Sequence, residues 1–199
     1  MDRNQAEVTE NSFCTLDEAV VHVNHEAGTL PSFRRQYPQA QVIERLLDKH
    51  VGIWLERGYC HKWEPTVANP RQLWNSPLLG VPSAWDNRSQ VTEVRPCMDL
   101  KGVNMHLTDV DIFPMTNIRQ MLSAVAGAKL FTKLDLRKAF NQMLLDQDSK
   151  HKLSFMWRGQ SYTFTRGPFG LKFLSSQFQR LKQAVFKDMP FAYCYIDDI

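Results

Sequence analysis

Cysteine is scarce in this sequence, and long apolar runs are absent. The four cysteines form no CxxC pair, which argues against a zinc ribbon, and we expect no disulfides in an intracellular setting. No apolar stretch is long enough to span a bilayer, and the polar start Met1-Asp2-Arg3-Asn4-Gln5 does not resemble a secretory signal. We therefore expect a protein of the cytoplasm or nucleus.

Acidic residues are missing from one long stretch. No Asp or Glu occurs between Ser149 and Lys187, although the whole chain carries a net charge of only +3. A basic segment beside an acidic remainder indicates contact with a polyanion. A solvated helix face plus a hairpin is the alternative. The basic residues of this stretch are Lys150, Lys152, Arg158, Arg166, Lys172, Arg180, Lys182 and Lys187.

The bulk composition is that of a globular protein. Of 199 residues, 43% are hydrophobic and 23% are charged, which suits one domain or two small subdomains with a core. Residues 1–30 are acidic and weakly periodic, and we expect them to form a loosely ordered leader.

Helical periodicity occurs in three segments. Apolar residues recur at helical spacing after Pro38 as far as Gly58, in 114–127, and again in 173–186. Each of these segments is predicted to be a helix with one apolar face.

Strand-like apolar runs lie between the helical segments. Hairpins are predicted within 78–97, with a long tip, and within 153–165, and single strands within 129–136 and 191–196. Because helices and strands are interleaved without regular alternation, the pattern favours an α+β fold.

Carboxylates stand at the ends of two of these predicted strands. Asp135 closes one apolar run, and Asp197-Asp198 closes the other. Buried carboxylates side by side repel each other, and a divalent cation would remove that cost. A tight turn would let Asp197 face Asp135, with Asp198 at the flank and Tyr195 on the same face as Asp197. The alternative is that Asp-Asp is only a turn.

The wider pattern resembles the reverse transcriptases of gypsy-type LTR retrotransposons, over about residues 31–199. Six blocks occur in that family's order and at its spacing. They are Pro38-Gln39-Ala40-Gln41-Val42-Ile43 with the helix that follows, Trp74-Asn75-Ser76-Pro77-Leu78-Leu79-Gly80-Val81-Pro82, Arg95-Pro96-Cys97-Met98-Asp99-Leu100-Lys101-Gly102-Val103-Asn104, Phe131 to Phe140, Gly167-Pro168-Phe169-Gly170-Leu171 with Phe178-Gln179-Arg180, and Tyr195-Ile196-Asp197-Asp198.

The resemblance implies the fingers and palm of a right-hand polymerase, with an antiparallel palm sheet backed by helices and no thumb. The fingers would comprise 31–108 and 143–172, and the palm 109–142 and 173–199, the last part being incomplete. The implied activity is that of an RNA-directed DNA polymerase, which extends a primer on an RNA or DNA template. We expect these 199 residues alone to be inactive, and the rest of a Pol polyprotein, with RNase H and integrase, is an implied partner.

The resemblance also assigns roles to single residues. Asp135, Asp197 and Asp198 would hold two Mg²⁺ ions, with Mn²⁺ as a substitute, and Leu136 would lend a carbonyl. Phe140 would exclude the 2′-hydroxyl of ribonucleotides. The incoming dNTP would meet Arg95, Arg137, Lys138, Ala139, Phe140, Phe169 and Gly170. The nucleic acid would meet Asn104, Arg166, Lys172, Gln179 and Tyr195.

This chain departs from the family pattern at several positions. Ser83-Ala84 stands where lysines usually follow the Val-Pro of the fingers hairpin, and Ala139, Asn141 and Lys101 replace a common glycine, histidine and arginine. The rival hypothesis is therefore an inactive remnant that binds nucleic acid or a protein partner. An unrelated Mg²⁺ nuclease would share the acids but would not explain Phe140.

Overall fold

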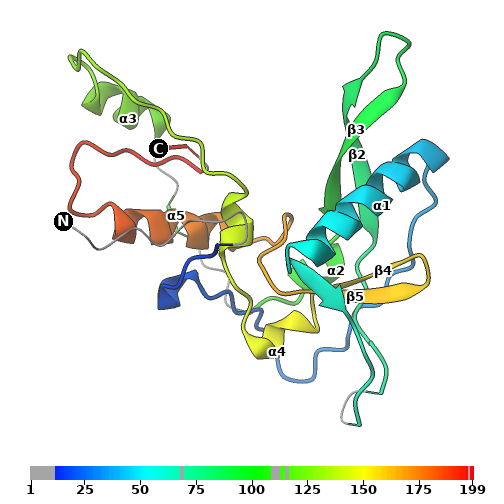
Figure 1. The fold of residues 1–199 in the computed structure, drawn as a ribbon. Coiled ribbons are helices and arrows are strands. Elements are labelled where there is room, and N and C mark those ends of the chain that lie inside the picture. Colours follow the sequence, from blue (N-terminus) through cyan, green and yellow to red (C-terminus); the bar gives the residue numbers. More distant parts are fainter. Residues whose placement is uncertain (1–11, 68–69, 109–112, 115–116, 197) are drawn as a thin grey trace.

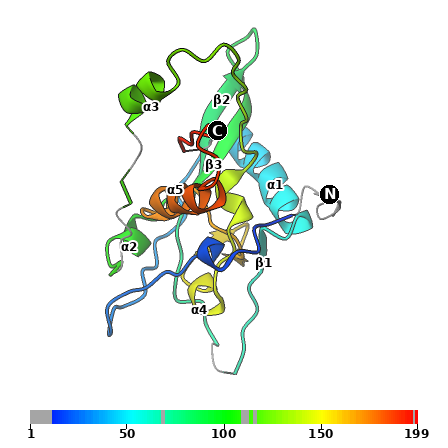
Figure 2. The same ribbon diagram turned by 90° about the vertical axis from the view of Figure 1, so that its left-hand side faces the viewer.

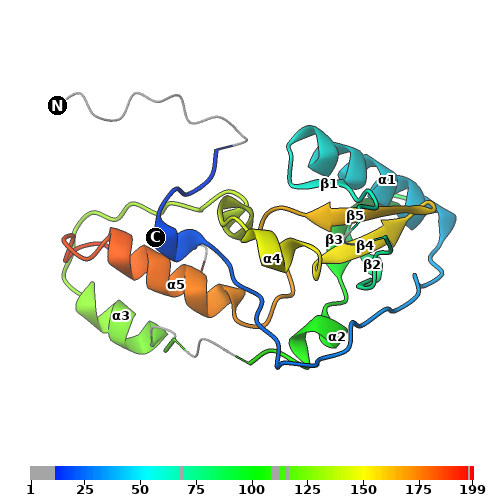
Figure 3. The ribbon, with the colours of Figure 1, turned by 90° about the horizontal axis from the view of Figure 1, so that it is seen from below.

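The computed structural model describes residues 12–67, 70–108, 113–114, 117–196 and 198–199. Its elements fall into two groups that lie side by side (Figure 1; Figure 3). One group holds helix α1 and all of the strands, and the other holds α5, α3 and the segment that follows α5. The fold is α+β with antiparallel pairing, as predicted. Within the described residues, no helix is both long enough and apolar enough to cross a membrane.

Helix α1 (Gln41–Glu56) confirms the first predicted helix. Ile43, Leu47 and Val51 recur every fourth residue and are buried, because such spacing places side chains on one helix face. The helix ends at Glu56, and Gly58 follows the C-cap residue with a φ of +65°, which suits a residue without a Cβ.

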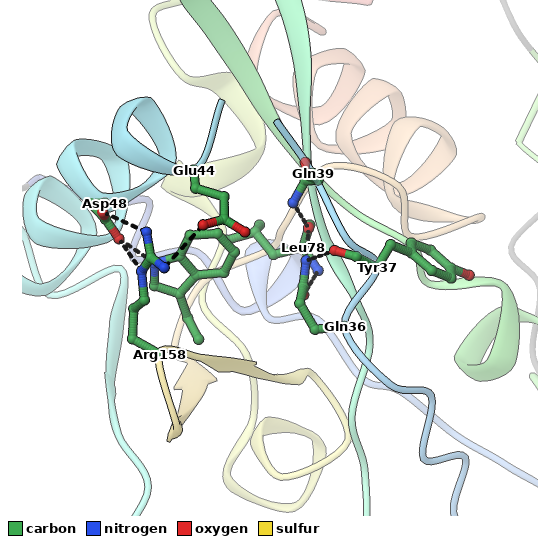
Figure 4. Close-up of polar contacts among 8 residues, drawn as sticks. Gln36, Tyr37, Gln39, Glu44, Asp48, Leu78 and Arg158 are labelled. Atoms are coloured by element: carbon green, nitrogen blue, oxygen red, sulfur yellow. Dashed lines mark hydrogen bonds and ion pairs between the residues drawn. The ribbon is translucent and has the colours of Figure 1, made fainter. Parts of the chain in front are cut away.

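The β2–β3 hairpin (Leu78–Trp85 and Val91–Met98) packs against α1 and is the predicted long-tipped hairpin. Helix α1 and strand β2 approach closely at Gly80, where an added Cβ would lie 2.5 Å from Ile43 Cγ2. Figure 4 shows two glutamine side chains along β2. Gln36 accepts from the Leu78 N–H at 2.9 Å and donates to its carbonyl at 2.6 Å, while Gln39 accepts from the Gly80 N–H at 2.8 Å.

A three-stranded sheet of order β1-β5-β4 completes this group, with β1 Cys60–Lys62, β4 Ser154–Trp157 and β5 Gln160–Phe164. Its β4–β5 hairpin was also predicted. Arg158 and Gly159 form the turn with φ values of +49° and +77°, the left-handed geometry that a two-residue hairpin turn requires. The sheet packs its aromatic side chains against α1, where the Trp54 and Phe164 ring centroids lie 5.0 Å apart.

Helix α5 (Leu174–Val185) confirms the third predicted helix and buries Leu174, Phe178 and Leu181. The segment after it runs back alongside the helix (Figure 1; Figure 3). The short elements are 3-10 helix η1 Asp17–Ala19, α2 Lys101–Asn104, 3-10 helix η2 Ala139–Gln142 and α4 Gln147–Lys150.

Helix α3 (Ile118–Ala124) forms inside the predicted 114–127 segment, but the predicted apolar face is not buried. Asn117 caps it by accepting from the Arg119 N–H at 2.9 Å. Ile118 and Leu122 are 47% and 61% exposed. The helix lies at the margin of the molecule, away from α5 (Figure 2), so no neighbouring element covers that face in the described part of the chain.

The acidic leader is not loosely ordered from Ser12 onward, contrary to our expectation. Ala19, Val21 and Val23 are fully buried. Val21 pairs in parallel with Leu145, and its N–H donates to the Leu144 carbonyl at 2.7 Å. Apolar residues on alternate positions allow this segment to dock as an extended chain despite its acids. Residues 1–11 lie outside the described part.

The two single strands predicted for 129–136 and 191–196 are wrong. The first segment is extended, but Leu130 and Phe131 are 92% and 69% exposed. Phe191 is 78% exposed, and its segment forms turns and isolated bridges. An apolar run becomes a regular strand only where neighbouring strands continue the ladder, and here the pairing covers only a few residues.

Candidate active site

Tyr195 and Asp198 close a tight turn, which we call the Tyr195–Asp198 turn. Each donates its N–H to the other's carbonyl at 2.9 Å. Ile196, inside the turn, has a φ of +47°, which is unusual for a β-branched residue. The tight turn predicted from the sequence is therefore present. Asp197 lies outside the described residues.

Asp135 lies opposite Asp198 in an antiparallel bridge. Next to it, Leu134 and Ile199 exchange hydrogen bonds of 2.8 and 2.9 Å. Opposed residues of an antiparallel pair direct their side chains to the same face. The fold thus brings together two of the three predicted acids, and Asp198 takes the position facing Asp135 that we had assigned to Asp197.

The acids are more exposed than the sequence suggested. Asp135 is exposed, and the Asp198 side chain is 46% exposed. The expected cost of burying carboxylates is therefore small here, because the apolar run before Asp135 is itself uncovered. Lys133 Nζ lies 3.1 Å from Asp198 Oδ1, and sequence reasoning had missed this contact.

No group of three or more His, Cys, Asp or Glu suited to a metal ion occurs within the described residues. The predicted set includes Asp197, so the described part contains only two of its three acids. Leu136, the predicted carbonyl ligand, packs partly buried against the core. Tyr195, expected on the same face as Asp197, lines an apolar groove of about 1000 Å³ together with Phe131, Phe191 and Asp198.

Phe140 and Phe169, both assigned to the dNTP, are in contact. Phe140 lies in η2, and its ring meets Phe169 at 5.2 Å and Phe178 at 5.7 Å between centroids. Phe140 is only 8% exposed, whereas Phe169 is 47% exposed. Asn141 fastens η2 to the 167–171 loop by donating to the Gly167 carbonyl at 3.1 Å.

Arg137 and Lys138, also assigned to the dNTP, lie in a different hollow. A pocket of about 470 Å³ is lined by these two residues together with Arg57, Arg166, Tyr59, Phe13, Ser12, Cys14, Asn141 and Gln142. Lys138 Nζ lies 5.1 Å and Arg166 Cζ 5.0 Å from the centre of the Tyr59 ring. Arg57 and Tyr59 were not predicted, and no local pattern marks them. Of the other dNTP residues, Ala139 is buried in η2 and Arg95 lies exposed on β3.

Two of the predicted nucleic-acid contacts are buried inside the protein. Arg166 is 6% exposed and donates to the Ser12 and Asn141 carbonyls, both at 3.2 Å. Burial also lowers its pKa. Gln179 is 1% exposed and donates to the Cys194 carbonyl at 2.9 Å. Both roles were implied by the family resemblance, which does not indicate whether a side chain is exposed.

Asn104 contacts the 167–171 loop and the residue after it. It donates to the Gly170 carbonyl at 2.8 Å and accepts from the Lys172 N–H at 2.9 Å. The side-chain amide of Asn104 therefore holds the loop that carries Phe169. The Lys172 side chain is exposed.

Most basic side chains of the stretch between Ser149 and Lys187 make contacts within the protein. Arg158 pairs with Asp48 at 3.1 Å and with Glu44 at 3.0 Å on α1 (Figure 4). The Arg158 hydrogen bond lowers the pKa of Asp48. Lys152 donates to the Val23 carbonyl at 2.5 Å, and Lys182 is 3% exposed. The exposed members are Arg158, Lys172, Arg180 and Lys187.

Solved structures share this fold. The chain resembles the native protease-reverse transcriptase of prototype foamy virus with a TM-score of 0.70 and 22% identity, covering 88% of this chain and 22% of that one. The foamy viral protease-reverse transcriptase in complex with an RNA/DNA hybrid gives a TM-score of 0.69 and 20% identity, covering 89% and 22%.

Related sequences agree with this fold. The Pol polyprotein of transposon 412 from Drosophila melanogaster is 34% identical over 92% of this chain, and that of transposon gypsy from the same species is 29% identical over 99%. This chain spans 13% and 18% of their lengths. Residues 86–199, which include η2, the 167–171 loop and the Tyr195–Asp198 turn, match the family described as reverse transcriptase (RNA-dependent DNA polymerase). The chain therefore belongs to the reverse transcriptase family.

Proposed function

We propose that this chain is the fingers and palm of an RNA-directed DNA polymerase from a gypsy-type LTR retrotransposon. It would add nucleotides from dNTPs to a primer 3′-hydroxyl on an RNA or DNA template. The observation that carries the proposal is the bridge between Asp135 and Asp198 at the Tyr195–Asp198 turn, within the part that matches the family.

Reverse transcriptases generally use divalent metal ions, and the donor set here suits them. Two carboxylates face the same side and are open to solvent, and hard oxygen ligands are those that Mg²⁺ prefers. Asp135, Asp197 and Asp198 would hold two Mg²⁺ ions, or Mn²⁺ in their place. When bound, such ions activate the attacking hydroxyl and neutralise charge on the leaving pyrophosphate.

The other residues would position the substrates. The Phe140 and Phe169 rings form a continuous aromatic surface from the core to the exterior. The sugar of a dNTP would rest against this surface, and the bulk of the rings would exclude a 2′-hydroxyl. The guanidinium of Arg95 suits a phosphate because it can donate two parallel hydrogen bonds. Lys172 is exposed and suits the backbone of the nucleic acid.

Metal binding tests the proposal directly. Mn²⁺ titrated into the wild-type chain and into Asp135→Asn should show weaker binding in the variant. Asp188→Asn is the matched control, because Asp188 is also exposed but follows α5. Equal Mn²⁺ affinity in the wild type and in Asp135→Asn would remove Asp135 from the site.

An inactive remnant that still binds nucleic acid is the second candidate. Two observations favour it: Lys133 already pairs with Asp198, and Ser83-Ala84 lies on β2 where the family usually has lysines. Primer extension on poly(rA) by a longer polypeptide that contains this chain separates the two candidates. Extension that Asp135→Asn abolishes supports the polymerase, and binding without extension supports the remnant.

A further inference from the structure

A lysine is buried beneath the Tyr195–Asp198 turn. Lys182, on α5, is 3% exposed, and its Nζ lies 5.3 Å from the centre of the Phe178 ring. Its ammonium donates to the carbonyl of Ile196. A lysine is almost never this buried unless its charge is engaged, so this position calls for a specific role.

Lys182 acts together with the residue one helical turn before it. Gln179 donates to the carbonyl of Cys194 at 2.9 Å. Positions three apart lie on the same face of a helix. Helix α5 therefore offers two donors in register with the Cys194 and Ile196 carbonyls, and they hold the segment that leads into the turn.

The carbonyl that Lys182 contacts belongs to a strained residue of this turn. Ile196 is β-branched and has a φ of +47°, a conformation that persists only where surrounding contacts determine it. Its carbonyl is part of the peptide bond to Asp197. A donor fixed on that carbonyl restrains a peptide group inside the turn that Asp198 closes.

We propose that Lys182 is a positioning residue for the acids of the Tyr195–Asp198 turn. The metal-binding part of this inference rests on the proposed function, whereas the restraint of the turn does not. The sequence had assigned Lys182 to a basic run that contacts the template, and its burial excludes that role in the described conformation.

Hydrogen exchange of single amides tests the restraint. Lys182→Met keeps the length and apolar stem of the side chain but removes the donor, and exchange at the Tyr195 and Asp198 N–H groups should accelerate on the order of 10-fold, the loss of one hydrogen bond to a charged group. Amides of β4 and β5 should be unchanged. Lys187→Met is the matched control, since Lys187 is exposed just beyond the same helix, and it should have no effect on the turn.

Mn²⁺ titration of the same variants tests the consequence for the acids. Lys182→Met should weaken Mn²⁺ binding several-fold, and Lys187→Met should not. Unchanged exchange at the turn, or equal acceleration in β4 and β5, would overturn the inference. If the turn loosens but the wild-type chain binds no Mn²⁺, the positioning role stands and the proposed function fails.

Discussion

Phe140 and Phe169 meet edge to face, with their ring planes at 65° and their centroids 5.2 Å apart. The Phe140 ring also contacts Phe178, so three aromatic rings from η2, the 167–171 loop and α5 form one edge-to-face cluster. The two rings differ greatly in burial, and we therefore expect their truncation to affect different properties.

Phe140→Ala should lower the free energy of unfolding by about 3 kcal/mol, because a buried ring leaves a cavity. Phe169→Ala should cost clearly less, since half of that ring is already in water. Urea denaturation of both variants provides the measurement. Equal losses would show that Phe169 is as buried in solution as Phe140.

Phe140→Ala also tests whether Phe140 excludes ribonucleotides. In an active polymerase that contains this chain, Phe140→Ala should raise ribonucleotide incorporation relative to dNTP, because it removes bulk where the 2′-hydroxyl would sit. Single-nucleotide incorporation with matched rNTP and dNTP gives the ratio. A ratio that does not change argues against a gating role for Phe140.

The two contacts of Asn104 lead us to expect that its substitution has a local effect on the 167–171 loop. Asn104→Asp keeps the acceptor for the Lys172 N–H but removes the donor to the Gly170 carbonyl. We expect a loss of about 1 kcal/mol in unfolding free energy and faster hydrogen exchange in 170–172. Asn104→Leu, which removes both contacts, should cost more. If the two variants lose the same stability, the Gly170 contact accounts for the whole effect.

Nucleic-acid binding should depend on Lys172 but not directly on Arg166. Lys172→Glu should weaken binding to all homopolymers about equally and reduce its salt dependence. Arg166→Met should instead destabilise the protein, because the Ser12 and Asn141 carbonyls lose their donor. Fluorescence anisotropy at several salt concentrations and urea denaturation distinguish the two. Binding that is insensitive to salt would refute the electrostatic model.

Stability should decline on mild acidification. Burial lowers the pKa of His25, His50, His61 and His151 below the ordinary value of 6.5. A histidine with a lowered pKa in the folded state stabilises the protein above its unfolded pKa, and that contribution is lost as the pH falls below about 6.5.

Urea denaturation at about pH 7.5 and about pH 5.5 measures this loss. His25→Phe keeps a ring stacked on Trp74, whose centroid lies 4.9 Å away, and removes one titrating group. The difference between the two pH values should then shrink. An unchanged difference would assign the acid sensitivity to the other histidines.

Elements with a strong local pattern could be predicted from the sequence. The period of apolar residues located α1 and α5, and turn residues located both hairpins. The order of the blocks indicated that Asp135 would lie near the Tyr195–Asp198 turn, and the bridge between Asp135 and Asp198 agrees.

The predictions that were wrong concerned features that depend on contacts between segments distant in the sequence. The apolar run before Asp135 looks like a buried strand, but burial depends on neighbours that its own residues do not encode. Charge along the sequence likewise does not reveal partners: Arg158 neutralises acids on α1, and Lys182 lies in the core. The docking of Val21 beside Leu145 could not be predicted from an acidic segment with only weak periodicity.

The glutamines beside β2 have a consequence for association between molecules. An uncovered strand margin offers its N–H and carbonyl groups to any other extended peptide, which is how sheets join edge to edge into aggregates. Gln36 and Gln39 already occupy the groups of Leu78 and Gly80 on that margin. Their side-chain amides occupy the backbone groups that a further strand would use. This end of the hairpin therefore cannot accept another strand, while its tip stays open to solvent.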